Sequence, residues 1–177
     1  MYIKNLALMN YRNYESARIT FSEGINILYG DNAQGKTNIL EAIFVAGTTK
    51  SHRGSKDREI IRFGEDEGHI RADIRKNDMN RRIDMHLKRN KTKGIAIDMV
   101  PIHRSSELLG TMNMVFFSPE DLSIIKDSPS ERRNFMDMEL CQLDKIYVSN
   151  LTNYKKVLEQ RNNLLKQISF DRSKADM

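Results

Sequence analysis

The first fifty residues combine strand-like and helix-like hydrophobic patterns. Alternating apolar side chains predict strands over residues 2–9 and 15–21, and a short apolar run with β-branched and aromatic residues predicts a buried strand over 24–30. Residues 36–47 have apolar side chains at helical spacing instead, with Gly47 as the stop. Three strands ahead of the first helix argue against a simple doubly wound fold, in which helices alternate with strands from the start.

The middle of the chain predicts an antiparallel meander inserted after this helix, at about residues 67–99. Its three alternating runs are separated by turn-like sequences, of which Asn77-Asp78 is the tightest. The runs cover residues 68–75, 81–88 and 94–99. A further apolar run at 111–117 predicts a core strand.

Helical patterns fill the last third of the chain. A serine followed by a proline, a common helix start, occurs at Ser118 and at Ser128, and Glu131 completes a capping box that predicts a helix to about Cys141. From Asp144 almost to residue 168, an otherwise polar helix has apolar residues at alternating intervals of three and four, with Arg161 breaking the stripe: Tyr147, Leu151, Tyr154, Leu158, Leu165 and Ile168. Such a seam needs a partner, either the domain itself or a segment beyond residue 177.

Composition limits the class of protein. The chain has 177 residues, 39% of them hydrophobic and 30% charged, which is typical of a soluble globular protein. Neither a secretory signal nor an apolar run long enough for a membrane span is visible. The single cysteine, Cys141, excludes an internal disulfide and fits a reducing compartment. The four histidines (52, 69, 86 and 103) have no metal-ligand spacing, so we expect no zinc site.

Positive charge is concentrated in the meander. The net charge is +5, yet residues 71–93 hold nine Lys or Arg against three Asp, which is +6. Such a concentration indicates contact with a polyanion. A solvated hairpin whose edges are protected by basic side chains explains the same charges, and no aromatic residue interleaves with them as a base-stacking platform. The pattern alone leaves both interpretations open.

The sequence GDNAQGKT at residues 30–37 fits the phosphate-binding pattern G-x-x-x-x-G-K-[ST]. Gly30 and Gly35 allow turns closed to residues with a Cβ atom, and successive N–H groups at a helix N-terminus attract an anion. Lys36 would reach the β- and γ-phosphates, and the Thr37 hydroxyl would bind Mg²⁺. A chance match is expected in about one chain in two hundred, so with a strand before it and a helix after it the motif predicts nucleotide binding.

The second half of such a site is missing from the sequence. A hydrolytic P-loop protein needs an apolar strand that ends in an acidic residue, and the candidates at 95–98 and 115–121 are weak. No LSGGQ-like segment is present. We therefore expect negligible ATP hydrolysis by this chain alone. A small P-loop kinase or phosphotransferase and a non-catalytic, nucleotide-gated dimerisation module remain the alternatives.

Several segments together resemble the N-terminal part of the RecF family, bacterial recombination mediators that are ABC-type ATPases related to SMC heads. The similar segments are Tyr11–Tyr14, Gly30–Ile43, Lys50–Arg53, Phe117–Glu139 and Asn150–Gln167. The resemblance implies an α/β (α+β) fold: the N-terminal lobe of an ABC/SMC-type head at 1–142, with a mixed sheet and an antiparallel β-subdomain. Residues 143–177 would be the truncated start of a helical arm.

The resemblance also implies a function and site residues. The family binds ATP with Mg²⁺, dimerises around it as a weak ATPase in the cytoplasm, binds DNA and helps RecR- and RecO-type partners load recombinase in repair, replication and the SOS response to DNA damage. The implied site residues are Gly30, Asp31, Asn32, Ala33, Gln34, Gly35, Lys36 and Thr37 at the phosphates, Arg12 and Asn13 beside the nucleotide, and Thr37, Ser118, Glu120 and Asp121 for metal. The basic meander adds Arg81, Arg82, Lys88, Arg89, Lys91 and Lys93 as candidates for DNA contact.

Overall fold

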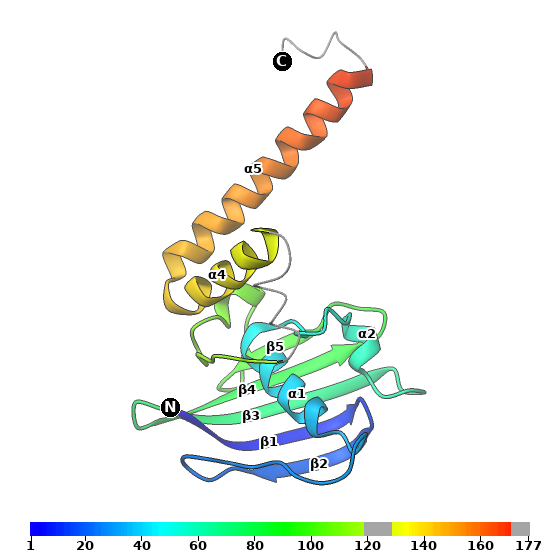
Figure 1. Cartoon of the computed structure of the whole chain (residues 1–177), viewed down its shortest axis with the longest axis vertical. Coiled ribbons are helices and arrows are strands. Elements are labelled where there is room, and N and C mark those ends of the chain that lie inside the picture. Colours follow the sequence, from blue (N-terminus) through cyan, green and yellow to red (C-terminus); the bar gives the residue numbers. More distant parts are fainter. Residues whose placement is uncertain (119–128, 171–177) are drawn as a thin grey trace. The chain divides into compact units, whose positions relative to one another are not determined.

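The structure, a computed structural model, describes residues 1–118 and 129–170, without the side chains of residues 169 and 170 (Figure 1). The chain divides into two compact units, Met1–Phe116 and Phe117–Met177. The first unit is an antiparallel sheet with helices, and the second is helical in its described part.

The first unit is built on a six-stranded sheet in the order β2-β1-β3-β4-β5-β6, in which every pair is antiparallel. The strands are β1 (Tyr2–Tyr11), β2 (Tyr14–Thr20), β3 (Glu67–Lys76), β4 (Met79–Lys88), β5 (Gly94–Ile97) and β6 (Val100–Pro101). The predicted meander thus continues the sheet of the first hairpin, because β1 pairs with β3 as well as with β2.

One face of this sheet is buried under helix α1 (Lys36–Thr48), which crosses it (Figure 1). Strands β3 and β4 bury every second side chain, as a half-covered sheet requires. Helix α1 contributes Ile39, Ala42, Val45 and Ala46 to the same core, and the sheet contributes Leu6, Leu8, Ile70, Ala72, Ile74, Ile83, Met85 and Leu87. The other sheet face, with His69 and Asp84, carries polar and charged side chains.

The turn between β3 and β4 is confirmed at Asn77-Asp78. Both residues have left-handed backbones, with φ of 49° and 61°, as a two-residue type I′ turn requires. Because this turn has two residues, it fixes the pairing of every residue of β3 with one residue of β4.

Two predicted strands are wrong. Residues 24–30 and 111–117 are not strands in a sheet. Ile25, Tyr29 and Val115 are 90%, 91% and 84% exposed, whereas Met112 is buried in the core. A strand is stable only when a neighbour accepts its hydrogen bonds, and the six strands of residues 1–116 pair among themselves. The apolar pattern is real, but the described part of the chain offers it no partner strand.

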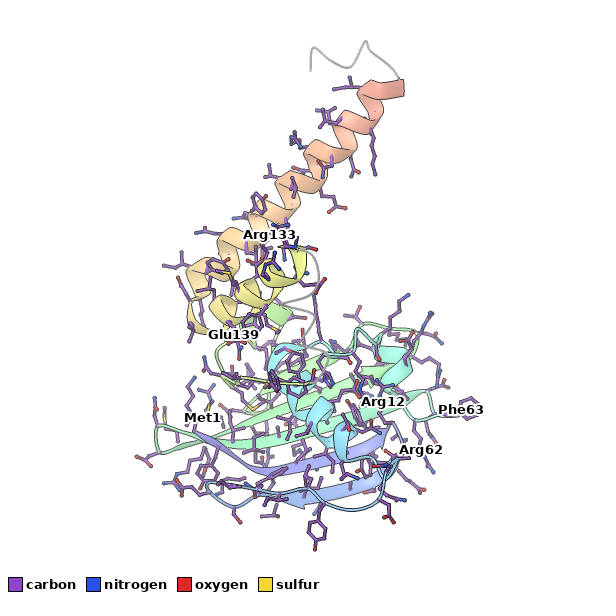
Figure 2. The ribbon with its side chains drawn as sticks, viewed as in Figure 1. Met1, Arg12, Arg62, Phe63, Arg133 and Glu139 are labelled. Atoms are coloured by element: carbon purple, nitrogen blue, oxygen red, sulfur yellow. The ribbon has the colours of Figure 1, made fainter. Side chains whose placement is uncertain are left out.

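Loops from distant parts of the chain meet at one end of the sheet. Tyr11 pairs with Ile61, and the backbone N–H groups of Arg12 and Arg62 donate to the carbonyls of Ile60 and Asn10. Arg12 and Arg62 therefore lie at the same end of the sheet (Figure 2). The short helix α2 (Asp57–Ile60) and the 3₁₀ turn η1 (Ser105–Glu107) complete the regular structure of the first unit.

The second unit contains a helical hairpin of α4 (Pro129–Leu143) and α5 (Lys145–Phe170). The Tyr147 hydroxyl donates to Asp137 at 2.6 Å across the two helices. Helices α4 and α5 belong to the same compact unit, which begins at Phe117. The domain boundary expected after residue 142 stays a prediction. Seam residues Tyr154, Leu158 and Leu165 on α5 are 63%, 36% and 48% exposed.

Within the described ranges, no helix has the length and apolar character to cross a membrane.

Candidate nucleotide-binding site

The loop at residues 30–35 has a backbone that glycine makes possible. Gly30 and Gly35 have φ of 137° and 99°, and Gly35 is the N-cap of α1. A Cβ atom on Gly35 would lie 2.7 Å from the Tyr14 hydroxyl oxygen and 2.8 Å from the side chain of Asn13. The second glycine of the motif is therefore required by its backbone angle and by the close approach of the β1–β2 turn.

The charged end of the loop is suited to an anion. The Lys36 ammonium donates to the carbonyl oxygens of Gly30, at 2.7 Å, and of Asp31. Thr37 lies exposed in the first turn of α1, which contains no acidic residue. The N-terminus of a helix carries about half a positive charge. A cation, a hydroxyl group and helix N–H groups thus gather at one short segment, as phosphate binding requires.

The turn between β1 and β2 is attached to this loop. The Asn13 side chain donates to the Gln34 carbonyl at 3.4 Å and accepts from the Asn38 side chain at 2.8 Å. Arg53, in the loop after α1, donates to the Asn38 side chain at 3.2 Å. Asn13 therefore lies next to the loop at residues 30–35, and its contact with a nucleotide stays a prediction.

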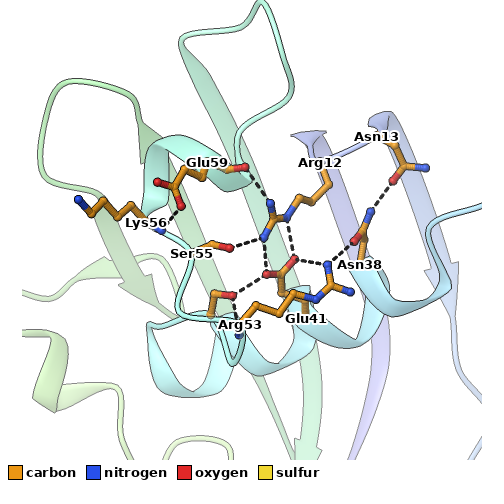
Figure 3. A network of polar contacts seen from close by, with 9 residues as sticks. Arg12, Asn13, Asn38, Glu41, Arg53, Ser55, Lys56 and Glu59 are labelled. Carbon is orange, nitrogen blue, oxygen red and sulfur yellow. Dashed lines mark hydrogen bonds and ion pairs between the residues drawn. The ribbon is translucent and has the colours of Figure 1, made fainter. Parts of the chain in front are cut away.

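A buried ion pair lies beneath the loop. The Glu41 side chain, on the second turn of α1, is 0% exposed, and Arg12 donates to both of its oxygens, at 2.8 and 2.6 Å. Arg12 also donates to the Glu59 carbonyl and to the Ser55 hydroxyl, while the Ser51 hydroxyl donates to Glu41. Figure 3 shows the guanidinium groups of Arg12 and Arg53 both directed at the Glu41 carboxylate.

This network keeps Glu41 ionised. Burial raises the pKa of Glu41, but the hydrogen bonds from Arg12 and Ser51 and the charges of Arg12 and Arg53 lower it by more, so the pKa lies below its usual value. Arg12 thus reaches the helix that follows the loop, not the loop itself. Its role in this structure is to fix α1 against the end of the sheet.

In their described residues, neither of the two candidate acidic segments forms the strand with a free terminal carboxylate that a hydrolytic site needs. Asp98 directly follows β5, as a catalytic acid would follow its strand, but its carboxylate pairs with Arg81 at 2.6 Å and accepts from the Arg82 N–H at 2.7 Å. It is therefore engaged in its own hairpin. The other candidate segment begins without a strand at Val115. Ser118 lies in the second unit, and Glu120 and Asp121 lie outside the described residues.

Most of the candidate DNA contacts are engaged with neighbouring groups. Arg81 pairs with Asp98, Arg82 with Asp73 and Lys93 with Asp57, while Arg89 donates to the Glu65 carbonyl and pairs with Asp66. Three carboxylates from outside residues 71–93, those of Asp57, Asp66 and Asp98, thus offset half of the net charge of +6. DNA contact by these residues stays a prediction.

One group of metal-ligating side chains was not predicted from the sequence. His69 and His86, seventeen positions apart, lie directly opposite each other on β3 and β4, with Glu67 beside them. Linear spacing gives no sign of such a group. The turn at Asn77-Asp78 could have revealed this pair. A two-residue turn fixes the register of the two strands, and counting outward from it places His69 opposite His86.

Comparison with known proteins identifies the class of the domain. The sequence profile of the AAA domain family matches residues 5–176, and the chain belongs to that family. The fold is similar to SMC ATPase heads, with a TM-score of 0.62 at 22% identity over 78% of this chain and 99% of the matched head. The expected N-terminal lobe of an ABC/SMC-type ATPase head is thereby confirmed.

Within this class, the resemblance to RecF is confirmed. The chain is 66% identical over 99% of its length to "DNA replication and repair protein RecF" of Lachnoclostridium phytofermentans, and 47% identical over all of its length to the protein of that name from Clostridium perfringens. It matches a solved structure of "the recombination mediator protein RecF-ATP in RecFOR pathway" with a TM-score of 0.91 and 39% identity over 96% of this chain and 46% of that chain. The chain spans 49% of the length of both sequence relatives.

Proposed function

We infer that this chain is the ATP-binding N-terminal part of a RecF-type ATPase, and that Gly30–Thr37 binds the phosphates of Mg-ATP. The observation that carries this proposal is the loop itself, in which Lys36 contacts the loop carbonyls at the N-terminus of α1. The Arg12–Glu41 pair fastens the next turn of α1. The relatives support it, because one solved structure is described as RecF-ATP.

Each residue has a proposed role. Lys36 exchanges the carbonyls of Gly30 and Asp31 for the β- and γ-phosphates, and Thr37 binds Mg²⁺ through its hydroxyl. Asn13 steadies the loop through Gln34, whereas Arg12 acts on the site indirectly, through Glu41. Ser118, Glu120 and Asp121 are proposed as further metal ligands by resemblance alone.

We propose the remaining functions for the whole protein, since this chain spans about half of its relatives. They are ATP-dependent dimerisation, DNA binding, weak ATPase activity, and recombinase loading with RecR- and RecO-type partners in the cytoplasm, with a part in the SOS response. Their support is the names of the relatives, which include replication, repair and recombination.

Binding without turnover is the first test of this function. Mg-ATP should bind the chain at one molecule per chain in calorimetry, while phosphate release stays at the level of Lys36→Ala, because Asp98 is engaged in its own hairpin. Phosphate release that depends on Lys36 would contradict the expected inactivity. Transfer of phosphate to a small acceptor would favour a kinase, and absence of ATP binding would favour a dimerisation module with a vestigial loop.

DNA contact by the hairpin has a charge-specific test. Among the six candidates, Lys88 and Lys91 are those for which the described residues provide no carboxylate ion pair. Lys88→Gln with Lys91→Gln should therefore reduce the slope of log affinity against log salt by about 2 on a duplex with a single-stranded extension. Lys155→Gln with Lys156→Gln on α5 removes the same charge and should leave the slope unchanged. Equal changes in both variants would refute a local contact.

A further inference from the structure

The open face of the sheet, opposite α1, carries a compact group of metal-ligating side chains. His69 and His86 are cross-strand partners, and their imidazole rings stack with centroids 4.2 Å apart and 19° between their planes. Glu67 lies two residues before His69 on β3, and its Oε2 is 2.7 Å from His86 Nε2. One nitrogen of each histidine and one oxygen of Glu67 all lie within 4.8 Å of one another.

We propose that Glu67, His69 and His86 form a binding site for a divalent transition-metal ion of the zinc type. Two imidazoles and one carboxylate are a donor set that Zn²⁺, Ni²⁺ and Co²⁺ accept, with water in the remaining position. Oxygen-preferring ions such as Mg²⁺ are not suited to a set with two nitrogen donors. The site is therefore chemically different from the Mg²⁺ position proposed at Thr37.

The backbone beneath these ligands holds them in place. Strand β3 is hydrogen-bonded on both sides, to β1 and β4, and β4 is hydrogen-bonded to β3 and β5. The residues that alternate with the two histidines, Ile70, Met85 and Leu87, are at most 1% exposed and anchor the strands to the core. Ligand atoms around a tetrahedral zinc lie roughly 3.3 Å apart. The three ligand atoms here lie within 4.8 Å of one another, so the side chains must move closer together to surround an ion.

The forms of the ligand groups themselves suit a metal ion, although the neighbouring Lys88 and Arg18 are positively charged. Burial and the neighbouring His86 lower the pKa of His69, and the hydrogen bond from His86 lowers the pKa of Glu67. A neutral imidazole and an ionised carboxylate are the forms that bind metal. Of the other charged groups that face the cluster, Arg71 and Asp84 pair with each other at 2.6 Å, which leaves Lys88 beside Glu67.

The cluster also borders open space. A hollow of about 500 Å³ on this sheet face is lined by both histidines and by Met9, Arg18, Ala96 and Pro101. Water or a small anionic ligand can reach a metal ion from this side. The metal-free alternative is a hydrogen bond between Glu67 and His86 with the His69 ring stacked on His86, and only a metal titration separates the two.

The test is titration of the chelator-treated chain with Zn²⁺ alone, in calorimetry, with Co²⁺ absorption as a report of imidazole coordination. We expect one Zn²⁺ per chain, a loss of about 100-fold or more in affinity in His69→Ala and in His86→Ala, and unchanged affinity in the matched control His103→Ala. Affinity should fall as the pH is lowered, because protons compete with the metal ion for the imidazole nitrogens.

Other outcomes overturn the proposal. Zn²⁺ that binds His69→Ala and His86→Ala as tightly as the unsubstituted chain, or no binding below millimolar Zn²⁺, excludes this site. Unfolding of the metal-free variants, followed by circular dichroism, separates loss of a ligand from loss of the fold. Should His86→Ala fail to fold, Glu67→Gln removes the carboxylate at an exposed position and should lower the affinity while retaining the fold.

Discussion

Replacing Lys36 with alanine should abolish the stabilisation of this chain by Mg-ATP. At about 100 times its dissociation constant, a ligand that binds only the folded state adds about 2.7 kcal/mol to the free energy of unfolding. For a chain of this size, that is a rise of roughly 5–10 °C in melting temperature. The variant should show no rise, because it lacks the ammonium group that would neutralise the phosphates. Thermal unfolding with and without Mg-ATP measures both values.

A matched control separates this effect from a general loss of charge. Lys156 lies exposed on α5, so Lys156→Ala should keep the full rise in melting temperature. Without nucleotide, Lys36→Ala should unfold close to the unsubstituted chain, because the Lys36 contacts at Gly30 and Asp31 are exposed. An Mg-ATP stabilisation that survives in Lys36→Ala would mean that the nucleotide binds somewhere other than this loop.

Arg12→Ala should destabilise the chain by about 3 kcal/mol, since it leaves the 0% exposed carboxylate of Glu41 without its bidentate partner. Urea unfolding at neutral pH measures this loss. The matched control is Arg62→Ala, at the same end of the sheet, whose pair with Glu15 is exposed and should contribute less than about 1 kcal/mol. Equal losses in the two variants would contradict the buried pair.

The same variant has a predicted pH dependence. In the unsubstituted chain the pKa of Glu41 lies below its unfolded value, so its contribution to stability is complete above that value and is lost as the pH falls through the folded pKa. Without Arg12, burial should instead raise the folded pKa, and acidification should relieve the destabilisation. The difference in unfolding free energy between the two proteins should therefore narrow from pH 7 towards pH 4.

Local patterns predicted the elements whose partners are close in the sequence. The loop at residues 30–37, the helix after it and the turn at Asn77-Asp78 each depend on a few neighbouring residues. The strands predicted at 24–30 and 111–117 failed because a strand also needs a neighbour, which an apolar pattern cannot guarantee. Both segments keep exposed apolar side chains, including Ile25 and Val115.

Side-chain partners were harder to predict than elements. The sequence brought Arg12 to attention only through a resemblance, and its partner Glu41 is 29 residues away on another element. The basic charges of residues 71–93 were counted correctly, but counting cannot show that Asp57, Asp66 and Asp98 come from outside the segment to balance them. Pairings of this kind depend on how separate elements pack, and local sequence patterns do not contain that information.

The central claim, that Gly30–Thr37 binds the phosphates of ATP, is tested most directly by amide nuclear magnetic resonance of the ¹⁵N-labelled chain during titration with Mg-ATP. We expect the backbone amide signals of residues 30–37 and of the first turn of α1 to shift and saturate together, while those of the β3–β4 hairpin keep their positions. Unmoved signals at residues 30–37 in saturating Mg-ATP, or shifts confined to other segments, would contradict it.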